Sequence, residues 1–209
     1  MIEKEVILMA TSKLLNGVNV DGLFSTVDAI KKDPEIAKFK FRATNRWVNG
    51  THNRAMVRDF YGALKEDASR DRLTFELDEP PVLLGKNRGA NPVEYLLAAL
   101  SGCLTTSLVA QASAKGIELK RVDSRYEGDL DLRGFLGISE DVPVGFQNVR
   151  VYFNIDADIS EEQKNELIGL AQKYSPVFNT LTRSVPVSVH LDKVMPKSRP
   201  DVPREAARA

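Results

Sequence analysis

The sequence predicts an α+β fold in a single domain, and three observations carry that prediction. Alternating apolar and polar residues run through 39–48, 55–62 and 72–78, with glycines and Asn/Asp clusters between them, as in an antiparallel meander. A long helical pattern from Pro92 to Lys115 is apolar on most sides through its middle, which is typical of a buried helix. A chain of 209 residues with 43% hydrophobic residues is also large enough to bury one sizeable core.

The chain divides into an N-terminal arm, residues 1–38, a main domain, residues 39–194, and a charged C-terminal tail, residues 195–209, which we expect to be flexible. Within the arm, Asp21 is placed to cap a short helix that Pro34 ends. The apolar face of this helix consists of Leu23, Val27 and Ile30.

The long helix has start and stop signals at both ends. Asn91 is a favourable N-cap, Pro92 a favourable first residue and Gly116 a typical C-terminal glycine. Residues 79–90, with prolines and glycines, are expected to form the loop before it. One face of the helix contains Leu96, Leu100, Cys103, Ser107, Ala110 and Ala114, and a second apolar side contains Val93, Leu97, Leu104 and Leu108.

Strands are expected after this helix over residues 118–134 and 146–158, the second with a clean apolar face of Val149, Val151, Phe153 and Ile155. Ser160 and Gln163 form a capping-box pattern that opens a second helix. Ser175 followed by Pro176 begins a further helical turn, and residues 185–194 are expected to close the fold as a strand.

The composition excludes several function classes. Lys+Arg and Asp+Glu both number 29, and no basic run is interleaved with aromatic residues, which argues against nucleic-acid binding. We expect no membrane-spanning helix, because no apolar stretch reaches the roughly 20 residues needed to cross a bilayer, and the N-terminus lacks the basic region of a signal peptide. With one cysteine, two distant histidines and no CxxC, we expect a cytoplasmic protein without a metal or another cofactor.

Cys103 is the sole cysteine and the one candidate redox centre. A free cysteine on a core helix most often packs as a small apolar residue. In mid-helix no helix N-terminus stabilises its thiolate, so activation would need a positive charge from another element. The sequence leaves open which arginine would supply that charge among Arg42, Arg46, Arg54 and Arg58.

Two other polar residues have a structural interpretation beside a functional one. Ser175 before Pro176 fits an N-cap, and no histidine near it in sequence would serve as a base for a serine nucleophile. Glu94 fits the first turn of the long helix, where a carboxylate interacts well with the helix dipole. Nine residues separate it from Cys103, which puts the two on opposite faces.

Three segments, in order, carry a family resemblance over about residues 40–191. They are the Asn-Pro opening of NPVEYLLAALSGCLTTSL, the cysteine late in that helix, and YSPVFNTLTRSVPVSV after the second helix. The chain is thereby similar to the OsmC/Ohr family, the osmotically inducible protein C and organic hydroperoxide resistance proteins. The resemblance implies a strongly bent antiparallel sheet wrapped around two central helices in an intertwined homodimer. In such a dimer we expect the arm of residues 1–38 to lie across the partner subunit, because its amphipathic helix must bury its apolar face.

The resemblance also implies a chemistry. In peroxidase members a cysteine on the central helix attacks a hydroperoxide, an arginine and a glutamate orient its thiolate, and a second cysteine resolves the product. Cys103 matches the first cysteine, Ser175 stands in the place of the second, and Arg54 corresponds to the arginine. The peroxidase glutamate directly follows the Asn-Pro, where this chain has Val93, with Glu94 one position on.

Three functions therefore stay open. The first is a one-cysteine thiol peroxidase that reduces organic hydroperoxides through Cys103, with an external thiol as the reductant. The second is a non-catalytic dimer that binds a small apolar or thiol-reactive ligand in the subunit-interface pocket. The third is a structural or stress-associated dimer without a ligand.

Overall fold

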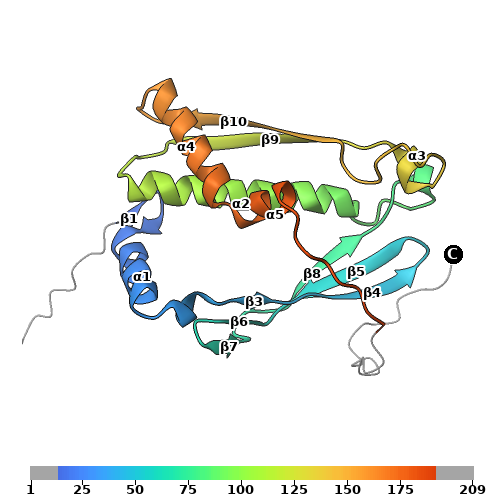
Figure 1. Ribbon diagram of the computed structural model, residues 1–209, viewed down its shortest axis with the longest axis horizontal. Coiled ribbons are helices and arrows are strands. Elements are labelled where there is room, and N and C mark those ends of the chain that lie inside the picture. Colours follow the sequence, from blue (N-terminus) through green and yellow to red (C-terminus); the bar gives the residue numbers. More distant parts are fainter. Residues whose placement is uncertain (1–13, 192–209) are drawn as a thin grey trace, which may run out of the picture.

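The computed structural model describes residues 14–191 and has the predicted α+β architecture, with antiparallel strand pairs and one long helix at its centre. Figure 1 shows this helix, α2 (Pro92–Ala114), between two layers. On one side lie a long two-stranded ribbon and the helix that follows it. On the other lie the short strands of residues 40–77. The predicted tail, residues 195–209, is outside the described residues.

The described part of the N-terminal arm begins with a hairpin that sequence reasoning missed. Strands β1 (Leu14–Leu15) and β2 (Val18–Asn19) are joined by Asn16 and Gly17, both with positive φ, as a two-residue hairpin turn requires. The Asn16 side chain donates to the Ser113 hydroxyl and the Ile117 carbonyl and accepts from the Leu119 amide. The described part of the arm is therefore fastened to the C-terminal end of α2 in its own chain.

Helix α1 (Val20–Lys32) forms where the arm was predicted to be helical, but its cap was assigned wrongly. Asn19, not Asp21, is the N-cap, because the Asn19 side chain accepts from the Gly22 amide while Asp21 lies in the first turn. The helix ends at Asp33, and Pro34 opens a single 3-10 turn, η1 (Pro34–Ala37), as the proline signal predicted.

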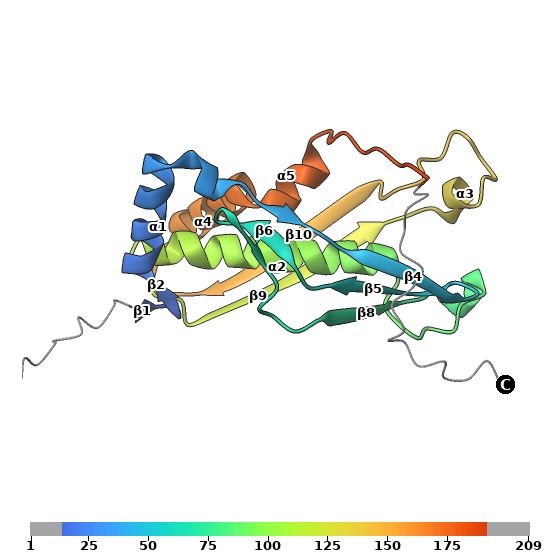
Figure 2. The same cartoon turned by 90° about the horizontal axis from the view of Figure 1, so that it is seen from below.

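The predicted meander is divided into two three-stranded antiparallel sheets. The first two runs each break into two strands, the third forms β8 alone, and β7 lies outside the predicted runs. One sheet has the order β3-β6-β7 and the other β4-β5-β8. The strands are β3 (Lys40–Phe41), β4 (Thr44–Asn49), β5 (His52–Val57), β6 (Phe60–Gly62), β7 (Lys65–Asp67) and β8 (Leu73–Leu77). Figure 2 shows the β4-β5-β8 sheet near the N-terminal end of α2 and extending past it.

Helix α2 starts as predicted, with a capping box between Asn91 and Glu94 and with Pro92 at its first position. Gly116 follows its C-cap at a φ of +74°, a conformation that glycine adopts without strain. The expectation that this helix is buried on most sides is wrong within one chain. Only one stripe is buried, formed by Leu100, Leu104, Leu108, Ala112 and Ser113.

By length and composition alone, α2 is also apolar enough to cross a membrane, so the prediction that no segment meets this test is wrong. The core helix of a water-soluble protein passes the same test. Helix α2 does serve as a core element here, because its buried stripe packs against α4, α5 and β9.

The core closes over α2 through the second half of the chain. Strands β9 (Arg121–Asp129) and β10 (Asn148–Asp156) pair antiparallel along their whole length, and a short helix, α3 (Leu132–Phe135), lies in the connection between them. Helix α4 (Glu161–Tyr174) begins with the predicted Ser160–Gln163 capping box and buries Leu167 and Ala171 against α2. Helix α5 (Pro176–Thr182) follows directly.

The closing strand predicted over 185–194 does not form in its described part, residues 185–191. These residues pair with no other strand between residues 14 and 191, so their backbone has no ladder of hydrogen bonds. The apolar side chains of this segment are exposed, and the exposed fractions of Val187 and Val189 are 84% and 90%. The apolar alternation of residues 185–191 is present, but within residues 14–191 it pairs with no sheet edge.

A buried carboxylate holds the loop that leads into α2. One oxygen of Asp78 accepts from the Thr51 hydroxyl (2.6 Å) and the Glu79 amide, and the other accepts from the amides of Lys86 and Arg88. The Thr51 hydroxyl and these three amides lower the pKa of Asp78 well below its usual range, although burial opposes this. The loop, which includes the turn η2 (Pro81–Leu83), is thereby folded back on β8.

Two glycines allow this close approach. A Cβ atom on Gly85 would lie 1.7 Å from the Glu79 carbonyl oxygen, and one on Gly89 would lie 2.0 Å from that of Glu76. Both clashes are with backbone, which cannot move aside as a side chain would. Glycine is therefore required at both positions for the loop to lie against the end of β8.

We expect Leu108→Ala to lower the free energy of unfolding by about 2–5 kcal/mol, because it leaves a cavity in the fully buried stripe of α2. Urea denaturation monitored by circular dichroism measures this. Leu136→Ala is the matched control, since Leu136 is 54% exposed, and it should change stability by less than about 0.5 kcal/mol. Equal losses in both variants would contradict the assigned core.

We expect Asp78→Asn to loosen the loop, because the amide cannot accept four hydrogen bonds as the carboxylate does. The lowered pKa fixes the sign of the pH dependence: the stabilisation is complete above the unfolded value of about 3.9 and is lost as the pH falls below it. Hydrogen exchange should show faster exchange of the Lys86 and Arg88 amides in the variant at pH 7. Unchanged protection there would contradict this role.

Candidate functional site

Cys103 carries a free thiol and lies half-buried near the middle of α2. Leu100, one turn before it, belongs to the buried core. Ser107, one turn after it, makes a long hydrogen bond of 3.5 Å from its hydroxyl to the Tyr174 carbonyl. The thiol therefore lies at the border between the packed side of α2 and the side that one chain leaves open.

Ser175 follows Tyr174 and is fully buried where α4 ends and α5 begins. Its hydroxyl oxygen accepts from the Phe178 amide at 3.2 Å, so the predicted N-cap is confirmed. The Ser107–Tyr174 contact puts Ser175 beside the turn of α2 that follows Cys103. A cysteine at position 175 could act as a resolving thiol for Cys103, but the serine present here forms no disulfide.

Arg54 lies on β5 directly opposite Glu76 on β8. Arg54 Nε donates to Glu76 Oε1 at 2.6 Å, and His52 Nε2 lies 2.6 Å from Glu76 Oε2. Partial burial opposes ionisation of this carboxyl group, but the hydrogen bonds from His52 and Arg54 leave the pKa of Glu76 below its usual value. Glu76 is thus a carboxylate that fixes the position of the guanidinium group.

The contact with Glu76 also determines the tautomer of His52. A carboxylate only accepts hydrogen bonds, so His52 Nε2 must carry a hydrogen. In the neutral ring Nδ1 is then an acceptor. It is buried and has no hydrogen-bond partner within residues 14–191.

Glu94 lies at the start of α2, and its carboxylate accepts from the Asn91 amide at 2.8 Å as the second half of the capping box. Asn91 also donates its side-chain amide to Glu79, whose pKa is raised chiefly by partial burial. The structural interpretation of Glu94 is confirmed by these contacts, while a catalytic role for it stays a prediction.

The described chain does not bring all the predicted site residues together. Helix α2, which carries Cys103, packs against α4, α5 and β9, whereas β5, which carries Arg54, packs against β4 and β8. The Ser175 segment contacts α2 through Ser107, whereas Figure 1 shows β5, the strand that carries Arg54, in the other layer. The candidate site is therefore in two halves.

Sequence reasoning missed Glu76 and His52. Glu76 is the polar residue between Phe75 and Leu77 in a strand that was predicted correctly. Only the register between β5 and β8 reveals that it faces Arg54, and register depends on turn geometry rather than on either strand alone.

Known proteins support the fold. A family model described as OsmC-like protein matches residues 85–190. An OsmC-like protein from Mycoplasma pneumoniae has a similar crystal structure, with a TM-score of 0.53 and 20% identity over 68% of this chain and 87% of that chain. An OsmC-like protein of unknown function from Vibrio cholerae has a TM-score of 0.50 and 12% identity over 67% and 92%.

No curated protein sequence is similar enough to match this chain. The two structures share too few identical residues to show more than the fold. The family model, by contrast, spans about half of the chain, from the loop that Asp78 anchors through Cys103 to the unpaired segment after α5. On that match, the chain belongs to the OsmC-like protein family.

Proposed function

We propose that this protein is a one-cysteine thiol peroxidase that reduces organic hydroperoxides as a homodimer. The observation that carries the proposal is the Arg54–Glu76 pair, a cation already oriented by a carboxylate in a chain whose single thiol is free and half-buried. In the dimer, Arg54 of one protomer would lie beside Cys103 of the other. Glu76 would then take the role of the family's glutamate after the Asn-Pro, which together with the arginine orients the thiolate.

The dimer accounts for surfaces that one chain leaves open. Helix α2 buries a single stripe, and residues 185–191 are an extended segment with apolar alternation and no sheet edge. Trp47 and Phe41, on the two small sheets, are 70% and 72% exposed. A second copy that supplied an edge for residues 185–191 and a second α2 would cover these surfaces and produce the bent sheet around two helices.

The chemical step needs only the thiol and the arginine. The Cys103 thiolate attacks the outer oxygen of the hydroperoxide, the O–O bond breaks, and the alkoxide leaves and takes a proton to become the alcohol. The cysteine is oxidised to a sulfenic acid and the peroxide is reduced. A guanidinium group beside the sulfur stabilises the thiolate and the negative charge that develops on the leaving oxygen.

Recovery of the thiol must use an external thiol, since Ser175 stands in the resolving position. One thiol displaces water from the sulfenic acid to form a mixed disulfide, and a second thiol releases Cys103 and leaves as a disulfide. The proposed setting is the cytoplasm, where such thiols are abundant, with neither a nucleic acid nor a membrane as a partner.

The second candidate function is a non-catalytic dimer that binds a small apolar or thiol-reactive ligand between the subunits. Cys103 is half-buried on a helix whose open side is apolar, which suits such a ligand. It differs from the peroxidase in one respect that is easily measured: its thiol would not react with a hydroperoxide.

We expect reduced protein to gain one oxygen within seconds from a slight excess of cumene hydroperoxide, followed by intact mass, with dimedone trapping the sulfenic acid. The gain should vanish in Cys103→Ser and reverse with a small thiol.

Arg54→Ala should slow this oxidation of Cys103 about 100-fold because the thiolate loses its oriented cation. The exposed Arg58 is the matched control, and Arg58→Ala should change the rate by less than about two-fold. A native thiol unmodified over many minutes would exclude the peroxidase and favour the ligand-binding dimer.

We expect light scattering to give a mass of two chains, and Val187→Asp to reduce it to one chain at micromolar concentration. A charge on the apolar face of the extended segment would be buried without a partner in the dimer. Ser188→Asp, on the opposite face one residue on, is the matched control and should stay dimeric. A monomeric native protein would contradict the proposed dimer.

A further inference from the structure

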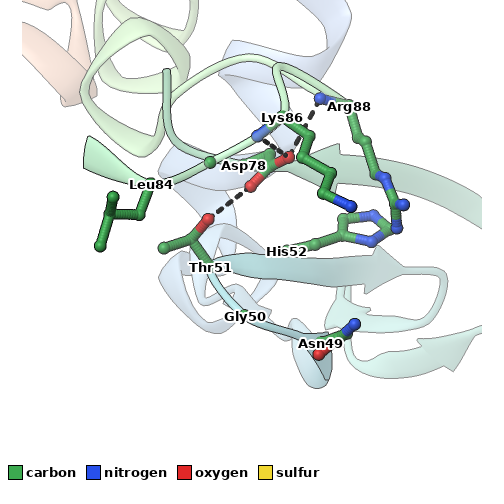
Figure 3. Close-up of a pocket in the computed structure, with 9 residues that line it drawn as sticks. Asn49, Gly50, Thr51, His52, Asp78, Leu84, Lys86 and Arg88 are labelled. Atoms are coloured by element: carbon green, nitrogen blue, oxygen red, sulfur yellow. Dashed lines mark hydrogen bonds between the residues drawn. The ribbon is translucent and has the colours of Figure 1, made fainter. Parts of the chain in front are cut away.

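A pocket lies where the turn between β4 and β5 faces the loop before α2, away from the thiol-bearing helix turn. Figure 3 shows that Thr51 and His52 form one wall and that Lys86 and Arg88 come from the facing loop, with their side chains reaching toward the His52 ring. Asn49 lies at its edge. The lining is therefore mostly polar and includes two cations.

His52 brings an unpartnered acceptor to this pocket. The residue is 8% exposed, its Nε2 is engaged by Glu76, and its Nδ1 is buried with no partner in the described part of the chain. Buried polar atoms nearly always have a hydrogen-bond partner, and one without is a candidate ligand contact. The missing partner must be a hydrogen-bond donor as long as the ring is neutral.

The two cations also lack a partner of their own. Neither the Lys86 ammonium nor the Arg88 guanidinium group takes part in an ion pair with any residue between 14 and 191. Asp78, the carboxylate among the residues that line the pocket, already accepts four hydrogen bonds from Thr51 and the loop amides. The loop thus places two positive charges at the pocket, and the hydrogen bonds of Asp78 are already made to Thr51 and to backbone amides.

We propose that this pocket binds a phosphate group, with its anionic oxygens on Lys86 and Arg88 and its P–OH group donating to His52 Nδ1. Phosphate combines the two properties that the lining calls for, since around neutral pH inorganic phosphate carries both negative oxygens and at least one hydroxyl hydrogen. A carboxylate has the charge but no hydrogen to donate. Arginine suits the planar pairing with two phosphate oxygens, and lysine adds a point charge.

This inference does not depend on the proposed peroxidase, because no residue of the pocket needs the thiol. The pocket and the proposed peroxidase site are connected through Glu76, whose carboxylate contacts both His52 and Arg54. A ligand bound to His52 Nδ1 would therefore alter the hydrogen bond from His52 to the carboxylate that orients Arg54.

Isothermal titration calorimetry of the full chain with inorganic phosphate, at pH 7 and constant ionic strength, tests the proposal. We expect saturable binding of one phosphate per chain and at least a ten-fold weaker affinity in the double variant Lys86→Ala, Arg88→Ala. Both side chains are exposed and their amides still reach Asp78, so the fold should persist. Lys65→Ala with Arg72→Ala removes the same charge elsewhere and should bind within two-fold of the native protein.

Histidine NMR supplies a second readout. The chain has two histidines, so the ¹⁵N signals of His52 are assigned by their loss in His52→Gln. Phosphate should shift the Nδ1 signal of His52 and leave His190 unchanged. Unsaturable binding, an equal loss in the Lys65/Arg72 control, no shift at His52, or acetate binding as tightly as phosphate would each overturn the proposal.

Discussion

The rest of the structure depends on one packing constraint, the burial of a single stripe of α2. Leu100, Leu104, Leu108 and Ala112 are covered by α4, α5 and the β9–β10 ribbon, and this contact organises the whole second half of the chain. The same geometry leaves the other side of an apolar helix without cover. Exposed apolar surface is costly in water, and the proposed homodimer would remove part of it by covering the open side of α2.

Glu76 has a comparable importance among the polar residues. Its carboxylate fixes Arg54 through one oxygen and the His52 tautomer through the other. Because β5 and β8 are paired in register here, all three side chains are oriented before any ligand arrives. An oriented cation costs less reorganisation when a charge develops beside it, which is the property that the proposed thiolate site needs.

Much of the fold could be predicted because its signals are local. Asn91 with Pro92, Ser160 with Gln163, and Ser175 with Pro176 each mark a helix start within four residues, and each cap forms. Asn16-Gly17 was an equally local hairpin signal that was overlooked. Predictions that depend on long-range strand pairing failed. Neither the unpaired state of residues 185–191 nor the position of Glu76 opposite Arg54 can be read from one strand, because each depends on which strands meet.

Ser175 shows how a local requirement and a chemical one meet at the same position. Its buried oxygen accepts the Phe178 amide at the start of α5, and a hydroxyl is a better acceptor for that role than a thiol. A serine there secures the helix start but leaves Cys103 without a resolving neighbour. Any sulfenic acid formed on Cys103 would then have to be reached by a thiol from solution. A fully buried thiol would prevent that approach, whereas the half-buried position of Cys103, at the border between the packed and the open side of α2, permits it.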